Sequence, residues 1–348
     1  MSQPFVTVIV PARNEERYIE RCLYSLAAQD YPRERLEVLV LDGMSTDETP
    51  RIVSRFAAES TLEVRLLDNP RRIPAGAMNI ALGQARGEII VRLDAHATAA
   101  TDFISRSVAA LEAGEVECVG GVIESEGDTW FGRAVALAMS SRFGVGSAAF
   151  RTGGEPGATD TVAFGAYRAS VFETIGGFAE DIDRGEDDEF NYRLRDAGGR
   201  IVLSPSIHST YFCRTTLREL ARQYWGYGVA KASVLQRHPS RLSARHFVPS
   251  ALVIALGGGT LLSIVNRRFA WLPLLAGAAY GVANGLATLS IARKGNQKEA
   301  RYLPAAFACI HLPAGAGFLY GMARGLARRR STAPAMQAPA EEPAVTND

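Results

Sequence analysis

The sequence predicts an α/β domain with a doubly wound, mostly parallel sheet, followed by C-terminal transmembrane helices. In the first 240 residues, short apolar runs with strand character alternate with segments of helical periodicity, and the connections are short. Such alternation is typical of βαβ units with right-handed crossovers. From residue 247 onward the composition changes to long apolar stretches with few charges, which is typical of membrane-spanning helices.

The elements of the α/β domain are expected in strict alternation. The fourth strand lies within residues 88–99 and opens with a near-continuous apolar run from Ile89 to Leu93. A run without alternation fits a parallel strand that is covered on both faces. We expect the other strands at 5–11, 36–42 and 62–68, and helices at 15–28, 46–58 and 74–85.

Three apolar stretches, at 247–265, 269–292 and 303–326, predict attachment to a membrane. The third contains His311, Pro313 and Arg324 and is the weakest candidate for a span. The alternative is a set of buried helices in a soluble domain, but apolar runs near 20 residues are rare there. The expected division is a domain at 1–240, a membrane region at 247–326 with two to three spans, and a disordered tail at 327–348, which is rich in Pro and Ala.

Basic segments indicate how the chain is oriented. Residues 237–246 and 293–301 are rich in Arg and Lys, and the positive-inside rule places both in the cytoplasm. A hairpin of two spans between them satisfies this rule. A third full span would place the arginines at 328–330 outside the cytoplasm. We therefore expect the last stretch to be re-entrant or interfacial, or else the other basic segments to determine the orientation. We therefore expect a multi-pass protein of the plasma membrane with the α/β domain in the cytoplasm.

Composition and missing motifs exclude several classes of protein. A formal net charge of +1 gives no argument for nucleic-acid binding. Four scattered cysteines without a Cys-x-x-Cys pair indicate a reducing compartment and no disulfide framework or zinc knuckle. The N-terminus has no basic segment typical of a signal peptide. Neither a dinucleotide-binding glycine motif nor a P-loop is present.

Polar side chains follow several predicted strands at the point where each strand ends. Asn14 and Glu15 follow the first strand, Asp42 ends the second, and Asp94 and His96 follow the fourth. The carboxyl ends of parallel strands line one crevice, where α/β proteins bind their ligands. Taken alone, the loop after Asp42 could be only a turn and a helix cap. Because all of these groups end at one edge, we expect a shared ligand site.

Four segments occur along the chain in this order: VTVIVPARNEE, VLVLDGMSTDET, NIALGQARGEIIVRLDAHA and GGFAEDIDRGEDDEFNYRLRDAGGRI. Together they resemble family 2 glycosyltransferases. The similarity covers about residues 5–230 and is greatest to membrane-attached bacterial members that build exopolysaccharides such as succinoglycan on a lipid carrier. It implies a GT-A fold, a nucleotide-diphosphate sugar as donor and inversion at the anomeric carbon.

The resemblance implies a divalent metal at the end of the fourth strand. Family members carry an Asp-x-Asp motif there, and this chain has Asp94-Ala95-His96. On an extended segment both side chains would face the crevice. A carboxylate suits Mg²⁺ or Mn²⁺, and an imidazole shifts the preference toward Mn²⁺. His208 is a further candidate ligand. The alternative is that either histidine is structural.

The resemblance also implies how the nucleotide is bound. Asp42 corresponds to the family aspartate that accepts a hydrogen bond from the base, typically uracil. The loop with Pro11, Ala12, Asn14 and Glu15 would surround base and ribose. Two arginines after the third strand, Arg72 or Arg71, could contact a phosphate, or could lie on a solvated face.

The catalytic base is expected among the acids of residues 186–189. Such acids could simply favour a helix N-terminus, but crowded carboxylates in a cleft raise one another's pKa, which suits a general base. The resemblance assigns the pair to Glu186 and Asp187, with Asp187 removing the acceptor proton and Asp188 as the competing choice.

The acceptor is expected to be a polyprenyl-linked saccharide held in the membrane beside the cleft. The Gln-x-x-Arg-Trp motif of processive family members is absent around residues 217–231, which favours transfer of one sugar. A processive polysaccharide synthase remains the nearest alternative. A non-catalytic sugar-nucleotide sensor or scaffold, with a decayed metal site, and a nucleotidyl transferase are two others.

Overall fold

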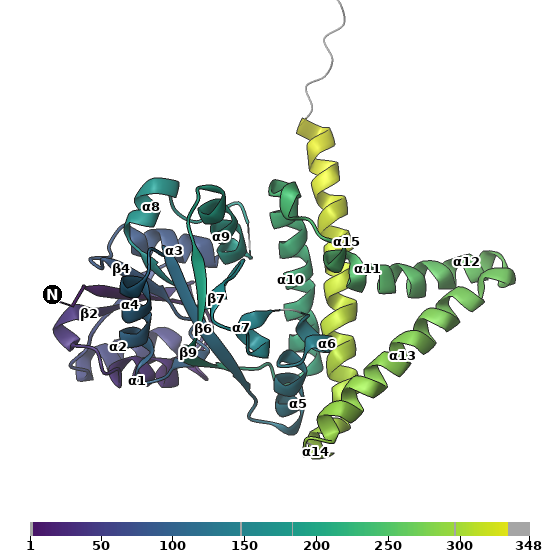
Figure 1. Ribbon diagram of the computed structural model, residues 1–348, viewed down its shortest axis with the longest axis horizontal. Coiled ribbons are helices and arrows are strands. Elements are labelled where there is room, and N and C mark those ends of the chain that lie inside the picture. Colours follow the sequence, from purple (N-terminus) through teal and green to yellow (C-terminus); the bar gives the residue numbers. More distant parts are fainter. Residues whose placement is uncertain (1–2, 147, 183, 296, 333–348) are drawn as a thin grey trace, which may run out of the picture.

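The computed structural model describes residues 3–332 except 147, 183 and 296. It consists of an α/β domain and a helical C-terminal region, which lie on the left and right of Figure 1. The α/β domain has a mixed, mostly parallel sheet surrounded by helices, so the predicted α/β architecture is confirmed.

One sheet organises the α/β domain, with the strand order β3-β2-β1-β4-β8-β6-β9-β5. Strands β1 to β4 are parallel to one another, β8 is antiparallel to β4 and β6, and β6 is parallel to β9. Short strands β5 and β7 pair antiparallel with β9. The bounds are β1 Val6–Ala12, β2 Leu36–Asp42, β3 Glu63–Asp68, β4 Ile89–Arg92, β5 Ala97–Ala99, β6 Cys118–Glu126, β7 Gly157–Ala158, β8 Ala166–Arg168 and β9 Ile201–Phe212.

Helices cover both faces of the parallel strands, which explains their unbroken apolar sequence. Val8 and Val10 of β1 pack in one core with α1 and α2, whereas Ile9 packs in a second core with α3. Strand β2 is buried at every position. The helices of this domain are α1 Ile19–Ala27, α2 Thr49–Glu59, α3 Pro74–Leu82, α4 Phe103–Ala113, α5 Trp130–Met139, α6 Arg142–Val145, α7 Ala149–Thr152, α8 Ser170–Ile175 and α9 Glu186–Asp196.

Three predicted element boundaries differ from the structure at the edge where the polar residues gather. Helices α1 and α2 begin four and three residues later than predicted, because residues 14–16 and 45–49 bond to each other across the edge. The fourth strand ends at Arg92, and Asp94 to His96 form a turn closed by the Ala97 amide on the Asp94 carbonyl at 3.0 Å. The extended segment expected at these residues is therefore absent.

The C-terminal region contains three helices that are long and apolar enough to cross a membrane, at Val248–Val265, Arg267–Ala292 and Leu303–Ala327. The first two are only 11% and 6% buried and project away from the rest as a hairpin (Figure 1). The third is 39% buried because α15 packs along α10. The elements are α10 Leu217–Arg237, α11 Val248–Val253, a π-helical turn Ile254–Gly258, α12 Gly259–Val265, α13 Trp271–Ala292, α14 Gln297–Ala300 and α15 Leu303–Thr332.

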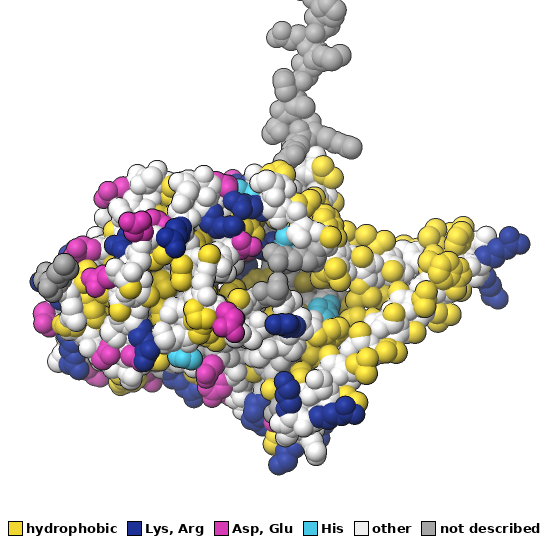
Figure 2. All heavy atoms as spheres, viewed as in Figure 1, with side chains coloured by type: hydrophobic (Ala, Val, Ile, Leu, Met, Phe, Trp, Pro, Cys, Tyr) yellow, Lys and Arg dark blue, Asp and Glu magenta, His cyan; other side chains and the backbone are white. Residues whose placement is uncertain are grey.

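The kinds of side chain on the surface differ between the α/β domain and the hairpin (Figure 2). Figure 2 shows hydrophobic side chains over most of the hairpin and Lys and Arg side chains at its tip, where Arg267 and Arg268 join α12 to α13. Helix α15 continues to Thr332, so residues 327–332 of the predicted disordered tail are helical. The rest of that tail, 333–348, lies outside the described residues.

Candidate active site

The loops after β1, β2 and β3 meet at the carboxyl edge of the sheet, and their backbone is strained. Asn14, Met44 and Arg72, one in each loop, have φ angles of 55°, 58° and 60°. Left-handed φ angles are uncommon for residues other than glycine and gather at functional sites. This observation places a candidate site at the edge predicted from the sequence.

The first two loops are locked together by hydrogen bonds. The Asn14 amide donates to Ser45 Oγ at 2.8 Å, and the Thr46 amide donates to Asn14 Oδ1 at 2.8 Å. The Glu15 amide donates to Thr49 Oγ1 at 2.8 Å. Asn14 and Glu15 are thus brought beside the loop of Asp42, as predicted, and Pro11 and Ala12 are the last residues of β1, paired with Leu41 and Asp42.

Asp42 presents a buried acceptor that has no partner. Its residue is 5% exposed, and Oδ2 accepts the Ser45 amide at 3.0 Å. Oδ1 has no hydrogen-bond partner among the described residues. Because an unpaired buried acceptor costs free energy, this oxygen fits a ligand that donates an N–H group.

The loop after β3 separates the two candidate arginines. Arg71 pairs with Glu180, whereas the Arg72 side chain is exposed and has no ion-pair or hydrogen-bond partner in the described part of the chain. Asn69, which the sequence analysis missed, is 3% exposed and has an unpaired Oδ1. Arg72 is therefore the arginine available to an anionic ligand.

Arg92, also missed, joins the end of β4 to the start of α9. Its guanidinium is 3.2 Å from Asp94 Oδ1, 2.7 Å from Glu186 Oε1 and 3.8 Å from Asp187 Oδ2. Its side chain is 13% exposed. The sequence feature that could have identified Arg92 is its position at the end of an otherwise apolar strand, because a buried guanidinium needs carboxylate partners.

Asp94 and His96 both lie at this edge but make different contacts. Burial alone would raise the pKa of Asp94, yet Arg92 and then His96 hold it below its usual value. His96 Nδ1 lies 3.0 Å from Glu15 Oε1, although not in a hydrogen-bonding direction, so this buried nitrogen is unpaired among the described residues. In the described part of the chain, no three His, Cys, Asp or Glu side chains gather closely enough to hold a metal ion alone.

His208 lies away from the other candidate metal ligands. It lies inside β9 rather than after it, four residues before Phe212, whose amide bonds to the His96 carbonyl. Four strand residues span about 13 Å. The His208 side chain is half exposed and faces Glu124 at 4.0 Å, so its surroundings are those of a surface residue.

The predicted acids begin helix α9, and each has its own environment. Glu186 is 2% exposed and paired with Arg92. Asp188 accepts a hydrogen bond from Lys231 Nζ on α10 at 2.5 Å. Asp187 Oδ1 accepts the Asp188 amide at 2.8 Å, and its side chain is 38% exposed.

These environments make Asp187 the strongest candidate for a general base among the three acids. Desolvation raises its pKa to about 7; Arg92 opposes this shift, and Glu186 and Asp188 add to it. A carboxylate that titrates near neutral pH can take up a proton during a reaction. Lys231 neutralises Asp188, which makes Asp188 the weaker candidate. Lys231 could not be predicted as a partner of Asp188, because the pair joins two helices and its members are 43 residues apart in the sequence.

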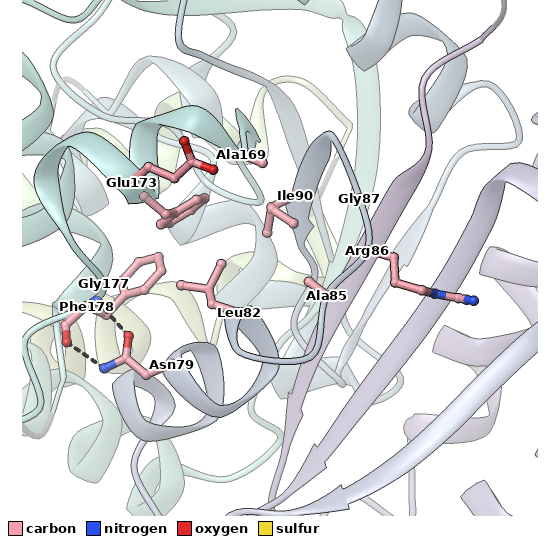
Figure 3. Close-up of a pocket in the computed structure, with 11 residues that line it drawn as sticks. Asn79, Leu82, Ala85, Arg86, Gly87, Ile90, Ala169, Glu173, Gly177 and Phe178 are labelled. Atoms are coloured by element: carbon pink, nitrogen blue, oxygen red, sulfur yellow. Dashed lines mark hydrogen bonds between the residues drawn. The ribbon is translucent and has the colours of Figure 1, made fainter.

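A cavity of about 620 Å³ lies at the opposite, amino end of β4 and is separate from these groups. It is lined by α3, α8 and the turn before β4 (Figure 3). The Asn79 amide donates to the Phe178 carbonyl at 2.9 Å and accepts its N–H at 2.8 Å. Because parallel sheets bind ligands at their carboxyl edge, the candidate active site is at the other end of the strands.

Comparisons with known proteins agree with this geometry. Residues 7–176 match the family model "Glycosyl transferase family 2". The succinoglycan biosynthesis protein ExoA of Rhizobium meliloti is 33% identical over 261 residues, which is 74% of this chain and 78% of that protein. The Methanococcus voltae dolichyl N-acetyl-alpha-D-glucosaminyl phosphate 3-beta-D-2,3-diacetamido-2,3-dideoxy-beta-D-glucuronosyltransferase is 29% identical over 240 residues, 67% of this chain and 74% of that protein.

A solved structure is similar over most of its length. The mannosyltransferase PcManGT of Pyrobaculum calidifontis, in complex with GDP-Man and Mn²⁺, has a TM-score of 0.59 and 25% sequence identity, and the match covers 92% of this chain and 88% of that one. The matched family segment carries the loops of Asn14, Asp42, Arg72 and Asp94. The chain belongs to glycosyl transferase family 2.

Proposed function

We propose that this family 2 glycosyltransferase transfers one sugar, with inversion, from a nucleotide-diphosphate sugar to a polyprenyl-linked saccharide held in the membrane. The observation that carries the proposal is Asp187, a carboxylate with a pKa near 7 that lies beside Arg92 at the carboxyl edge of the sheet, the same edge at which Asp42 Oδ1 is unpaired among the described residues. Asp42 Oδ1 fits a nucleotide base, and the Asp187 carboxylate fits removal of a proton from the acceptor.

The donor is held by groups from three strand ends. Asp42 Oδ1 accepts an N–H of the base, and the strained loop of Asn14 and Glu15 surrounds the ribose. Arg72 contacts the diphosphate, because its guanidinium is free of protein partners and matches phosphate geometry. We favour a uridine nucleotide; the similar mannosyltransferase is complexed with a guanosine nucleotide, whose base also presents an N–H donor.

A divalent metal, Mn²⁺ or Mg²⁺, fits Asp94 and His96. The Asp94 carboxylate is kept ionised by Arg92, and the buried His96 Nδ1 lacks a partner. Because these two groups do not make a complete site alone, the donor diphosphate must supply further ligands. When bound, such a metal stabilises the negative charge of the departing diphosphate. The Mn²⁺ in the similar mannosyltransferase supports the assignment.

Asp187 performs the proton transfer in this proposal. Its carboxylate removes the proton from the acceptor hydroxyl, whose oxygen attacks the anomeric carbon from the side opposite the diphosphate. An α-linked donor thus gives a β-glycoside, and the enzyme forms no covalent bond to the sugar. Arg92 positions Glu186 and the start of α9. Lys231 pairs with Asp188, so that Asp188 is less able than Asp187 to accept the acceptor proton.

The position of the base beside the membrane helices supports a lipid-linked acceptor. Helix α10, which carries Lys231, packs along α15, and α15 packs against α11 of the hairpin. We propose that the hairpin spans the plasma membrane, with its basic flanks and the catalytic domain in the cytoplasm. The extensive packing of α15 on α10 fits an interfacial helix better than a third span.

Nucleotide release by the purified protein tests the proposal. The protein in detergent is incubated with UDP-, GDP- or dTDP-sugars and a mixture of lipid-linked acceptors, with Mg²⁺, Mn²⁺ or chelator. We expect release with one donor, dependent on metal and acceptor, and loss in Asp187→Asn. Glu59→Gln, an exposed acid at the far end of α2, is the matched control. Donor binding without turnover for any donor, unchanged in Asp187→Asn, would instead identify a sensor or scaffold.

A further inference from the structure

An apolar cavity of about 500 Å³ lies where the hairpin meets the α/β domain. Its walls come from α6, α11, α13 and α15, and include Phe143, Leu252, Ala276 and His311. Figure 2 shows the recess between the hairpin and the rest of the molecule, with hydrophobic side chains over it. The volume is within the range of ligand-binding pockets, about 300–1,000 Å³.

The polar side chains inside the cavity satisfy one another. His311 Nε2–H donates to the Phe143 carbonyl at 2.8 Å, and the Tyr280 hydroxyl pairs with His311 Nδ1 at 3.0 Å. The cavity interior therefore offers an apolar surface without an open hydrogen-bonding group. An occupant that buries hydrocarbon fits this surface, whereas a sugar would lose its hydrogen bonds to water there.

Arg142 gives the cavity one charged edge. It lies on α6 among the lining residues, its side chain is exposed, and it has no ion-pair or hydrogen-bond partner in the described ranges. The combination of a hydrocarbon-lined recess and a free guanidinium at its edge matches a lipid with an anionic head group, because guanidinium binds phosphate through paired hydrogen bonds.

The cavity is connected to the base through two helices in close contact. A Cβ atom at Gly228 of α10 would lie 2.1 Å from the Ala314 carbonyl oxygen of α15, so glycine is required there. A Cβ at the next residue of α15, Gly315, would lie 2.3 Å from the carbonyl oxygen of Pro249, which lines the cavity. Lys231, the partner of Asp188, follows Gly228 by three residues.

We propose that this cavity binds the isoprenoid chain of the acceptor, with Arg142 on its phosphate. The inference rests on the proposed function and locates the acceptor's lipid, which that function leaves open. Two walls of the cavity belong to helices that are little buried in the protein, as membrane-facing helices are. The isoprenoid chain can therefore enter the cavity from the bilayer. Its phosphate is then held by Arg142 on α6, seven residues before α7 begins at Ala149. Arg151 on α7 stacks over Tyr211 of β9 at 5.0 Å, and the Tyr211 ring contacts the His96 ring with 4.9 Å between centroids.

Photo-crosslinking of the full chain in detergent tests binding without requiring turnover. The probe is farnesyl phosphate with a diazirine at its tail. We expect crosslinks in peptides of α11 and α13, competed by unlabelled polyprenyl phosphate but not by phosphatidylglycerol. Equal competition by phosphatidylglycerol, or crosslinks spread evenly over the hairpin, would show an ordinary lipid-facing surface and overturn the proposal.

Kinetics with matched variants provide the second test. Ala276→Phe fills the cavity, whereas Ala278→Phe, two residues along the same helix and outside the lining, is the control. We expect Ala276→Phe and Arg142→Ala each to raise the KM for a lipid-linked acceptor about tenfold, with partial rescue in Arg142→Lys and an unchanged KM for the donor. An unchanged acceptor KM in Ala276→Phe would refute the lipid site but not the proposed function. Absence of transfer by the wild type would refute the proposed function.

Discussion

The pH dependence of transfer is set by the charges around Asp187, and two neighbouring substitutions should move it in opposite directions. Asp188 raises the pKa of Asp187, and Lys231 pairs with Asp188. Asp188→Asn removes a negative neighbour and leaves the Lys231 ammonium nearby, so the pKa of Asp187 should fall. Lys231→Gln leaves the Asp188 charge unpaired, so the pKa of Asp187 should rise.

The expected magnitudes follow from the pKa of about 7 for Asp187. Because the base must be ionised, the wild-type rate should rise with pH and reach its plateau above 7, with about one tenth of the plateau left at pH 6. A single charge at this distance shifts a pKa by about one unit. At pH 6, Asp188→Asn should keep about half of its plateau rate and Lys231→Gln about one hundredth.

The assay is sugar transfer at limiting acceptor and saturating donor and metal, from pH 5 to 9, for the wild type and both variants. The ratio of each rate to its own plateau removes differences in total activity. Equal midpoints in all three proteins, or a wild-type midpoint near 4, would refute the assignment of Asp187 as the titrating base.

Four further predictions follow from individual contacts. Asp42→Asn should weaken nucleotide binding by about 1–3 kcal/mol, measured by calorimetry with UDP and GDP, with little change in kcat; unchanged affinity for both nucleotides would remove Asp42 from the site. Arg92→Met should leave the nearly buried Glu186 unpaired and destabilise the fold by about 3–5 kcal/mol, as measured by urea denaturation, whereas a stability equal to that of the wild type would show that the Arg92 pairs contribute nothing. His96→Asp should restore two carboxylates and shift the metal preference from Mn²⁺ toward Mg²⁺, read from rates after chelation and metal addition; an identical metal profile would show that His96 is structural. Burial would raise the pKa of Glu37, but hydrogen bonds from Thr7 and Arg86 lower it. The ionised Glu37 therefore stabilises the fold at neutral pH, and this stabilisation is lost as pH falls below the ordinary value of 4.5. Glu37→Gln should reduce the fall in melting temperature between neutral and acidic pH without changing kcat.

Local sequence patterns predicted the parallel half of the sheet well. The apolar run of β2 gave its bounds as Leu36–Asp42, because a strand buried on both faces has a continuous hydrophobic sequence. The edge where the polar residues gather followed from topology alone. Helix starts were less predictable, since the side chains of Asn14, Ser45 and Thr49 bond across loops 31 to 34 residues apart.

The pairing of charges could not be predicted in the same way. Arg92 contacts acids that lie two residues and more than 90 residues away, and Lys231 reaches Asp188 from another helix. These contacts depend on how α9 and α10 pack, which no periodicity encodes. The histidines illustrate the same limit: the sequence made both His96 and His208 candidate ligands, yet only His96 lies at the edge of the site.

The most direct test of Asp187 as catalytic base is a single-turnover transfer of labelled sugar to a lipid-linked acceptor at pH 8, with donor binding measured in the same samples. We predict that Asp187→Asn binds the donor as the wild type does and transfers sugar at least about 100-fold more slowly, the usual contribution of a general base, while Glu59→Gln behaves as the wild type. Transfer by Asp187→Asn within a few-fold of the wild type would contradict the account.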